Sequence, residues 1–314
     1  MQAIMVSEAG DPGVMRVAET ELPRPGPDEV LVRVIAAGVG PWDAYLRRGG
    51  WTGEFPYIPG AEFAGVVEGN TGEAAAFSDG EPVYGYPGLT GCHAQYLVCP
   101  SEQLAPIPEG LTPVEAAAVP VDGLTAEQGL MDILGIGRGD RVLITAGAGG
   151  MGHLAVQIAR ALGAYVIATA SPGNREFVHK LGADIVVDHT RPDWPDQVRS
   201  APGGGVNRVL ATVTPSLEGA ARAARDGAII ATPVRALEFP EANRVQWRPF
   251  NGRPTGSGLI RLAPWFGDGS LTVHVSGRYY WKNAAVAHRE VEQGHTRGKL
   301  VLIVDDDLAA SLEV

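Results

Sequence analysis

The chain has 314 residues, 45% of them hydrophobic and 19% charged, which is ordinary for a globular protein and long enough for two domains of roughly 100–200 residues. Its formal net charge of −11 and dispersed basic residues argue against nucleic-acid binding, and its two cysteines, Cys92 and Cys99, are too few for a disulfide scaffold or a four-cysteine zinc lobe. No apolar run approaches the ~20 residues of a membrane span and no basic segment opens the sequence, so we expect a cytoplasmic protein that acts on a small molecule and not at a membrane.

The first third of the sequence predicts a β-rich lobe. Turn residues divide residues 1 to about 108 into short strands. Hydrophobic and polar residues alternate within Val30–Ile35, and a continuous apolar run covers Ala64–Val67. These features are typical of a partly barrelled sheet.

A change of pattern near Thr112 marks the start of a helical passage. Thr112 can cap a helix, Pro113 suits its first turn, and Glu115 completes a capping box, after which the passage runs to about Leu134. Apolar strands then alternate with segments of helix length, which predicts βαβ units and a parallel, doubly wound sheet. The predicted strands are Val142–Thr145, Tyr165–Ala170, Ile185–Asp188, Val209–Val213 and Ala228–Thr232.

The last part of the sequence is expected to fold back onto the first lobe. Its predicted elements are a helix after about Thr255, a strand around Leu271–Val275, a helix near Asn283–Gln293 and a final strand Leu300–Val304. We therefore expect an α/β protein with a Rossmann domain over residues 118–257. A β-rich catalytic lobe would span residues 1–117 and be completed by residues 258–314.

The strongest single signal is a glycine-rich turn between a strand and a helix. Gly147, Gly149 and Gly152 have the spacing G-x-G-x-x-G, follow an apolar strand and open an amphipathic helix. Such glycines let the backbone approach a pyrophosphate, which is stabilised by free N–H groups and by roughly half a positive charge at the helix N-terminus. We predict that this turn, with Gly150 and Met151, binds a dinucleotide. The alternative is a tight strand-to-helix turn without a ligand.

The choice of dinucleotide depends on the end of the next strand, about 20 residues further on. An acidic side chain there would bind the ribose hydroxyls of NAD, but this chain has Ser171, Asn174 and Arg175 instead. An acid would repel the extra phosphate of NADP, whereas these side chains donate hydrogen bonds and positive charge to it. The sequence therefore predicts NADPH, unless Arg175 is only a solvated residue in the first turn of a helix.

Four further segments complete a family pattern: Gly38–Tyr45, Pro59–Val67, Gly123–Ala126 and Gly294–Leu302. Together with the glycine turn, they make the chain resemble the quinone oxidoreductases of the medium-chain dehydrogenase/reductase superfamily, including the zeta-crystallin-like proteins. The resemblance covers nearly the whole chain. It implies a GroES-like first lobe, a nicotinamide in the cleft between the lobes and usually a homodimer.

The same resemblance predicts a protein without zinc. Zinc-dependent relatives place a ligand Cys where Gly40 stands and a ligand His where Gly60 stands, and glycine has no side chain to bind a metal. A catalytic zinc needs three protein ligands, and the nearest Cys/His pair, Cys92–His93, lies in an apparent strand, where adjacent side chains point to opposite faces. Glu62 is common to relatives with and without zinc, which favours a packing or ion-pairing role here.

The missing zinc favours conjugated acceptors. Reduction of an isolated ketone puts full negative charge on one oxygen, which a Lewis acid normally stabilises. A quinone or an α,β-unsaturated carbonyl delocalises that charge onto a remote oxygen, where one or two hydrogen bonds suffice. We therefore predict an NADPH-dependent oxidoreductase that transfers hydride to a quinone or enone. The candidate hydrogen-bond donors are Tyr45, Thr125 and Tyr84.

The resemblance also suggests the remaining site residues. Tyr45 and Asp43 are the catalytic candidates, although Tyr45 could equally be packed in the core and Asp43 could anchor its own turn. Trp42, Trp51 and Tyr84 are expected to line the substrate pocket. The cofactor contacts expected besides the glycine turn are Gly40, Pro41, Thr125, Ser171, Asn174, Arg175, Thr232 and Lys299.

Three departures from the family pattern leave other functions open. Related reductases commonly carry Asn where Gly40 stands and Tyr where Trp51 stands, and they often have an acid followed by glycine within Ala211–Thr214. An indole at Trp51 would favour flat aromatic ligands. The alternatives are a tailoring reductase or cyclase of an aromatic natural-product pathway, and a cofactor-bound sensor or structural protein with little turnover.

Overall fold

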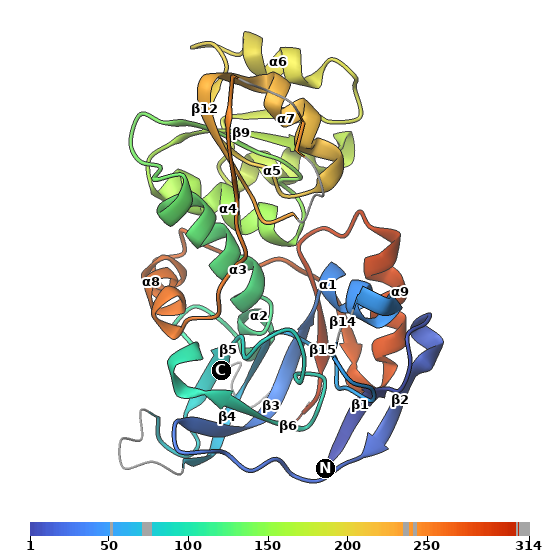
Figure 1. Ribbon diagram of the computed structural model, residues 1–314. Coiled ribbons are helices and arrows are strands. Elements are labelled where there is room, and N and C mark those ends of the chain that lie inside the picture. Colours follow the sequence, from blue (N-terminus) through green and yellow to red (C-terminus); the bar gives the residue numbers. More distant parts are fainter. Residues whose placement is uncertain (51–52, 71–76, 235–238, 241–243, 306, 308–314) are drawn as a thin grey trace. The chain divides into compact units, whose positions relative to one another are not determined.

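The computed structural model describes residues 1–50, 53–70, 77–234, 239–240, 244–305 and 307. The chain divides into two compact units (Figure 1). Unit 1 contains Met1–Val121, Pro254–Gly269 and Val273–Val314, and unit 2 contains Asp122–Arg253 and Ser270–Thr272. The chain therefore leaves unit 1 to form unit 2 and then returns to unit 1.

Unit 1 is built on a seven-stranded sheet in the order β14-β15-β3-β4-β5-β7, with β6 paired to β3, and on a two-stranded sheet of β1 and β2. Strand β3 is buried from Val34 to Val39, as expected for a central strand, and β15 pairs with it antiparallel. The strands are β1 Gln2–Val6, β2 Met15–Glu19, β3 Glu29–Val39, β4 Phe63–Asn70, β5 Pro82–Gly85, β6 Tyr96–Pro100, β7 Leu104–Pro106, β14 Val275–Tyr280 and β15 Lys299–Ile303. The helices and helical turns are η1 Pro12–Val14, α1 Pro41–Tyr45, η2 Leu46–Gly50, η3 Ser101–Gln103, α2 Pro113–Ala116, α8 Gly256–Gly267, η7 Trp281–Asn283 and α9 Ala284–Gln293.

Unit 2 is a six-stranded parallel sheet in the order β10-β9-β8-β11-β12-β13. The order reverses between β8 and β11, and open α/β sheets bind ligands at the carboxyl ends of their strands beside such a reversal. The strands are β8 Arg141–Ile144, β9 Tyr165–Ala170, β10 Ile185–Asp188, β11 Val206–Leu210, β12 Ala224–Thr232 and β13 Gln246–Pro249. The helices and helical turns are α3 Pro120–Glu127, which begins in unit 1, η4 Gln128–Ile133, α4 Gly150–Ala161, η5 Pro172–Asn174, α5 Arg175–Lys180, α6 Trp194–Ser200, η6 Thr214–Ser216 and α7 Leu217–Ala223.

The predicted α/β fold class, a Rossmann sheet with a β-rich lobe, is confirmed. The capping box before α2 is also confirmed, because the Thr112 hydroxyl accepts the Glu115 N–H (3.3 Å) and the Glu115 carboxylate accepts the Thr112 N–H (3.0 Å). Among the described residues, no helix combines the length and the apolar character needed to cross a bilayer.

Three strand predictions are wrong in their bounds, and one of these strands, β12, begins at Ala224 and not at Ala228. The strand expected at Leu271–Val275 is β14, which begins only at Val275, because the N–H and hydroxyl of Thr272 are bound to the Gln157 side chain (2.9 and 3.0 Å). The strand expected at Val209–Val213 is β11, which ends at Leu210. Beyond that point the N–H of Thr212 donates to a threonine hydroxyl (2.9 Å) and no longer to a neighbouring strand.

The pair Cys92–His93 does not lie in a strand. Both residues precede β6, in an irregular segment that follows Gly91, whose φ of 109° turns the chain. We expected the two side chains to point to opposite faces of a strand, and this expectation is wrong because there is no strand here. Both side chains are buried. Cys92 and Cys99 are free thiols in one hydrophobic cluster, and burial raises the pKa of each.

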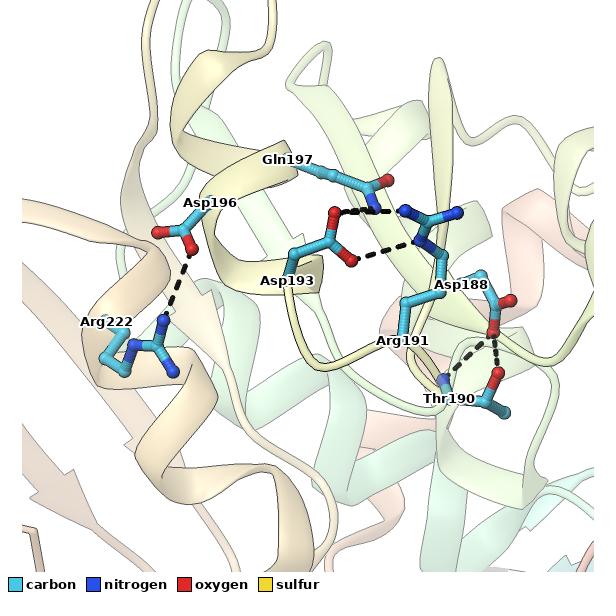
Figure 2. Close-up of polar contacts among 7 residues, drawn as sticks. All are labelled: Asp188, Thr190, Arg191, Asp193, Asp196, Gln197 and Arg222. Atoms are coloured by element: carbon cyan, nitrogen blue, oxygen red, sulfur yellow. Dashed lines mark hydrogen bonds and ion pairs between the residues drawn. The ribbon is translucent and has the colours of Figure 1, made fainter.

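Polar contacts on the surface of unit 2 order the segment from β10 to α7 (Figure 2). Arg191 pairs with Asp193 (3.0 Å), and the amide of Gln197 donates to the same carboxylate (3.1 Å). Arg222 on α7 pairs with Asp196 on α6 (3.3 Å). Because these side chains are exposed, solvent screens the pairs and they contribute little to stability.

Candidate active site

The predicted diphosphate turn connects β8 to α4. The N–H of Gly147 donates to the Thr169 carbonyl (2.8 Å) and the N–H of Ala146 donates to the Thr169 hydroxyl (3.0 Å), so the neighbouring strand β9 fixes the turn. A Cβ on Gly152 would lie 2.1 Å from the Ala146 carbonyl oxygen, and one on Gly147 would lie 3.0 Å from the Cβ of Ala168. Close packing therefore requires glycine at Gly152 and favours it at Gly147.

The first turn of α4 offers backbone N–H groups to a ligand. The N–H of His153 donates to the Gly149 carbonyl (3.0 Å), so the N–H groups of Gly150, Met151 and Gly152 have no acceptor within the helix. The helix has 12 residues and no acidic residue in its first turn, so no local carboxylate neutralises its partial positive charge. This glycine-lined cradle fits the diphosphate of a nicotinamide dinucleotide.

Ser171, Asn174 and Arg175 lie within one turn after β9, the strand next to β8. The Asn174 amide donates to the Ser171 hydroxyl (3.2 Å). Arg175 is exposed and, in the part of the chain that the structure describes, forms no ion pair with a carboxylate. The structure therefore gathers two polar side chains and an available cation where the sequence predicted a phosphorylated ribose.

The neighbouring strand β10 ends in an acid that is bound to its own turn. Asp188 pairs in register with Ala170, the last residue of β9. Its carboxylate accepts the N–H and the hydroxyl of Thr190 (2.9 and 2.7 Å), and these bonds lower the pKa of Asp188 (Figure 2). The end of β9 itself carries no acid to bind the ribose hydroxyls of NAD.

Sequence reasoning missed a hydroxyl cluster where the strand order reverses. The hydroxyl of Thr145 accepts the N–H of Thr212 (2.9 Å) and the hydroxyl of Ser216 (3.0 Å), and the Thr212 hydroxyl donates to the Thr145 carbonyl (2.7 Å). These bonds tie the carboxyl ends of β8 and β11 together next to the glycine turn. The only sequence signal was that Thr212 stands in a segment that departs from the family pattern.

Thr125 and Thr232, both predicted cofactor contacts, are buried in unit 2. The Thr232 hydroxyl accepts the N–H of Val234 (3.2 Å), and its carbonyl accepts the N–H of Phe250 (3.0 Å). A Cβ on Gly252 would lie 2.3 Å from the Thr125 hydroxyl oxygen. The surrounding chain therefore covers both side chains, which sequence periodicity could not reveal.

In unit 1, Asp43 is a buried carboxylate that joins two glycine backbones. Its oxygens accept the N–H groups of Gly40 (2.8 Å) and Gly60 (3.1 Å), and only 1% of the residue is exposed. Burial raises the pKa of Asp43 to about 7, against the lowering effect of these hydrogen bonds. This arrangement supports the interpretation of Asp43 as an anchor, with Pro41 between it and the helix cap at Gly40.

Glu62 and Lys299 form a buried ion pair beside Trp42. The Nζ of Lys299 lies 2.6 Å from one Glu62 carboxylate oxygen, and the other oxygen accepts the N–H of Val121 (2.8 Å). The same ammonium lies 4.7 Å from the centroid of the Trp42 ring. The ion-pairing interpretation of Glu62 is confirmed, and Lys299, expected at the cofactor, is held within unit 1 by this pair.

Neither position that carries a ligand in zinc-dependent relatives has room for a side chain. A Cβ on Gly60 would lie 2.4 Å from the His93 ring, and one on Gly40 would lie 2.2 Å from the Trp42 ring. The Nε2 of His93 lies 3.2 Å from the Gly38 carbonyl oxygen, and burial lowers the pKa of His93 to about 4. Within the described ranges, no group of three His, Cys, Asp or Glu side chains could hold a metal ion.

The tyrosines predicted at the site differ in exposure. Tyr45 is 60% exposed, so the alternative that it is packed in the core is wrong. Its ring covers Gly50, where a Cβ would lie 2.3 Å from a ring carbon. Tyr84 is fully buried and donates to the Leu259 carbonyl (3.2 Å), so it has no exposed surface to offer a substrate. Trp51 lies outside the described residues.

Comparison with known proteins places these features in a family. Residues 26–109 match the family described as alcohol dehydrogenase GroES-like domain, and residues 181–302 match the family described as zinc-binding dehydrogenase. The probable quinone oxidoreductase of Schizosaccharomyces pombe is 31% identical to this chain over 331 residues, which cover 98% of each protein. The trans-enoyl reductase pgmF of Aspergillus terreus is 30% identical over 90% of this chain and 88% of its own.

A solved structure agrees with these sequence matches. A mycobacterial protein complexed with NADPH superposes with a TM-score of 0.88 at 31% identity, over 97% of this chain and 100% of its own. Its likeness extends through both units, as does that of the yeast relative. The chain therefore belongs to the quinone oxidoreductase family of the medium-chain dehydrogenases/reductases and is an oxidoreductase.

Proposed function

We propose that this protein is an NADPH-dependent reductase that transfers hydride to a quinone or an α,β-unsaturated carbonyl compound without zinc. The observation that carries the proposal is the start of α4, where Gly150, Met151 and Gly152 offer N–H groups to a diphosphate. The quinone oxidoreductase and trans-enoyl reductase relatives support the two acceptor classes. The absence of side chains at Gly40 and Gly60 supports chemistry without zinc.

The preference for NADPH over NADH rests on the residues after β9. The planar guanidinium of Arg175 can bind a phosphate through two parallel hydrogen bonds, and Ser171 and Asn174 add polar groups beside it. The mycobacterial neighbour's NADPH complex supports this choice. The buried Thr125 and Thr232 would contribute only after local rearrangement or through their backbone.

The remaining proposed contacts belong to unit 1. Gly40 and Pro41 would meet the cofactor through their backbone, which Asp43 fixes by its hydrogen bond to Gly40. Lys299 would affect the cofactor only indirectly, by holding the Trp42 ring that its ammonium contacts. Asp43 is thus a positioning residue in this proposal.

The bound cofactor would supply the hydride. A conjugated acceptor takes hydride at a ring position or a β-carbon, so the developing negative charge lies on a remote oxygen. Tyr45 is the proposed donor to that oxygen, because its side chain is exposed and its hydroxyl has no hydrogen-bond partner among the described residues. Protonation of the product would follow from Tyr45 or from water.

We also propose, from the family resemblance, a cytoplasmic homodimer whose catalytic lobe comprises residues 1–117 and 258–314 and whose Rossmann domain comprises residues 118–257. Light scattering coupled to size-exclusion chromatography would test the dimer. A mass of one chain, 32.9 kDa, at micromolar concentration would contradict it.

Titration of the protein with NADPH and NADH tests the proposed function directly. Charge-assisted hydrogen bonds contribute about 1.5–3 kcal/mol, so Arg175→Ala should weaken NADPH binding roughly 10- to 100-fold and leave NADH binding nearly unchanged. Arg191→Ala is the matched control, because this exposed arginine is already paired with Asp193. Tight NADH binding with negligible NADPH binding would refute the preference.

Turnover is tested by NADPH oxidation with a panel of quinones and enals. The proposal requires oxidation with at least one acceptor of either class. NADPH binding without turnover across the panel would instead favour the sensor or structural alternative, and a failure to bind either dinucleotide would remove the basis of the proposal.

A further inference from the structure

Gly40 is a glycine because another side chain occupies its space. Its φ of −130° is ordinary extended backbone that any residue adopts, so conformation does not require glycine there. A Cβ at this position would lie 2.2, 2.3 and 2.4 Å from three ring carbons of Trp42. The indole therefore fills the volume that a side chain at residue 40 would take.

Several contacts hold the Trp42 ring in this place. The ammonium of Lys299 lies 4.7 Å from the ring centroid and is itself fixed by Glu62 (2.6 Å). The next residue, Asp43, ties the first turn of α1 to the backbone of Gly40 (2.8 Å). Lys299 thus contacts the ring itself, and Asp43 fixes the backbone that carries the ring.

The ring presents an apolar, aromatic surface. Trp42 is partly exposed, whereas its indole nitrogen is buried and has no hydrogen-bond partner among the described residues. What the indole can offer a ligand is therefore carbon surface and not a hydrogen bond, and the Lys299 ammonium already lies over the ring. Aromatic surfaces favour stacking with other flat rings, and a flexible acyclic molecule gains less from them.

We infer that Trp42 is a specificity-determining residue that takes the place of the residue-40 side chain and selects flat, cyclic conjugated acceptors over short acyclic enals. This inference rests on the proposed function and on the expectation that Trp42 lines the acceptor pocket beside the cofactor contact at Gly40. It names the acceptor class that the proposed function leaves open.

Steady-state kinetics with two acceptors tests the selection. Because ring stacking is worth about 0.5–1.5 kcal/mol, Trp42→Ala should lower the ratio of kcat/KM for 1,4-naphthoquinone to that for trans-2-hexenal roughly 2- to 12-fold. Trp42→Phe, which keeps a flat ring, should retain most of the wild-type ratio. Equal losses for both acceptors, or an unchanged ratio, would overturn the inference.

A second measurement tests the placement of the ring without relying on activity. Gly40→Ala should lower the melting temperature in the wild-type background and have little effect in the Trp42→Ala background. Equal effects in both backgrounds would show that the ring does not fill this space. If the wild type binds NADPH but reduces neither acceptor, the proposed function fails together with the selection, whereas turnover with an unchanged ratio overturns the selection alone.

Discussion

Replacing Asp43 by Asn is expected to change how stability depends on pH. Burial raises the pKa of this carboxyl from 3.8 to about 7, although it accepts the N–H groups of Gly40 and Gly60. A raised pKa means that the folded protein binds the proton more tightly than the unfolded chain does. The stabilising contribution of Asp43 is therefore fully present below pH ~4 and is lost as the pH rises through about 7.

The size of the effect follows from proton linkage. One pKa unit corresponds to about 1.4 kcal/mol, so the free energy of unfolding of the wild type should fall relative to that of Asp43→Asn by about 1.4 kcal/mol per pH unit between pH ~5 and ~6.5. Above pH ~8 the difference should be constant. Chemical denaturation followed by circular dichroism, at a series of pH values, measures both proteins.

Asp188→Asn is the control for this experiment. The Asp188 carboxylate lies in unit 2, and hydrogen bonds from Thr190 lower its pKa. The difference in the free energy of unfolding between Asp188→Asn and the wild type should therefore not change over the same pH range. A flat or rising difference for Asp43→Asn would refute the reasoning that burial outweighs two backbone hydrogen bonds at this carboxyl.

Other buried groups and the glycine turn allow three more tests. Burial lowers the pKa of His93 from 6.5 to about 4, so the contribution of this neutral imidazole to stability is lost as the pH falls through that interval. His93→Phe should therefore reduce the loss of unfolding free energy between pH ~6.5 and ~4, and an unchanged loss would contradict this. Gly152→Ala places a Cβ 2.1 Å from a carbonyl oxygen and should weaken NADPH binding at least about tenfold in fluorescence titrations, while Gly137→Ala, which meets open space, should not. Glu62→Gln should lower the free energy of unfolding by about 3 kcal/mol, because it removes the carboxylate charge that faces the buried Lys299 ammonium. The double variant Glu62→Gln/Lys299→Met should recover most of that loss in denaturation curves, and equal losses would count against the pair.

Local rules were sufficient where neighbouring residues decide the structure. The bounds of β9 and β10 follow from their apolar runs, and the start of α2 follows from the capping pair Thr112 and Glu115. The glycine turn was equally predictable, because Gly147, Gly149 and Gly152 have a recognisable spacing between a strand and a helix, although β9 supplies the packing at Gly147.

Long-range contacts explain what the sequence could not supply. Glu62 and Lys299 are 237 positions apart, and no spacing rule connects them. Likewise, the late start of β14 depends on the bond between Thr272 and Gln157, which are 115 positions apart. Tyr84 was expected to line the substrate pocket, but its hydroxyl donates to the carbonyl of Leu259 on α8, which is far away in the sequence.

The pairing of β15 with β3 has a consequence for synthesis. Unit 2 is made almost entirely from one continuous stretch of chain, whereas the sheet of unit 1 is completed by β15, which is translated after unit 2. Until Lys299 has been translated, the ion pair with Glu62 cannot form, and β3 lacks a neighbour along Ala36–Val39, where β15 pairs with it. A chain that ends before β15 would thus lack this ion pair and expose part of a strand edge, which favours association with other chains.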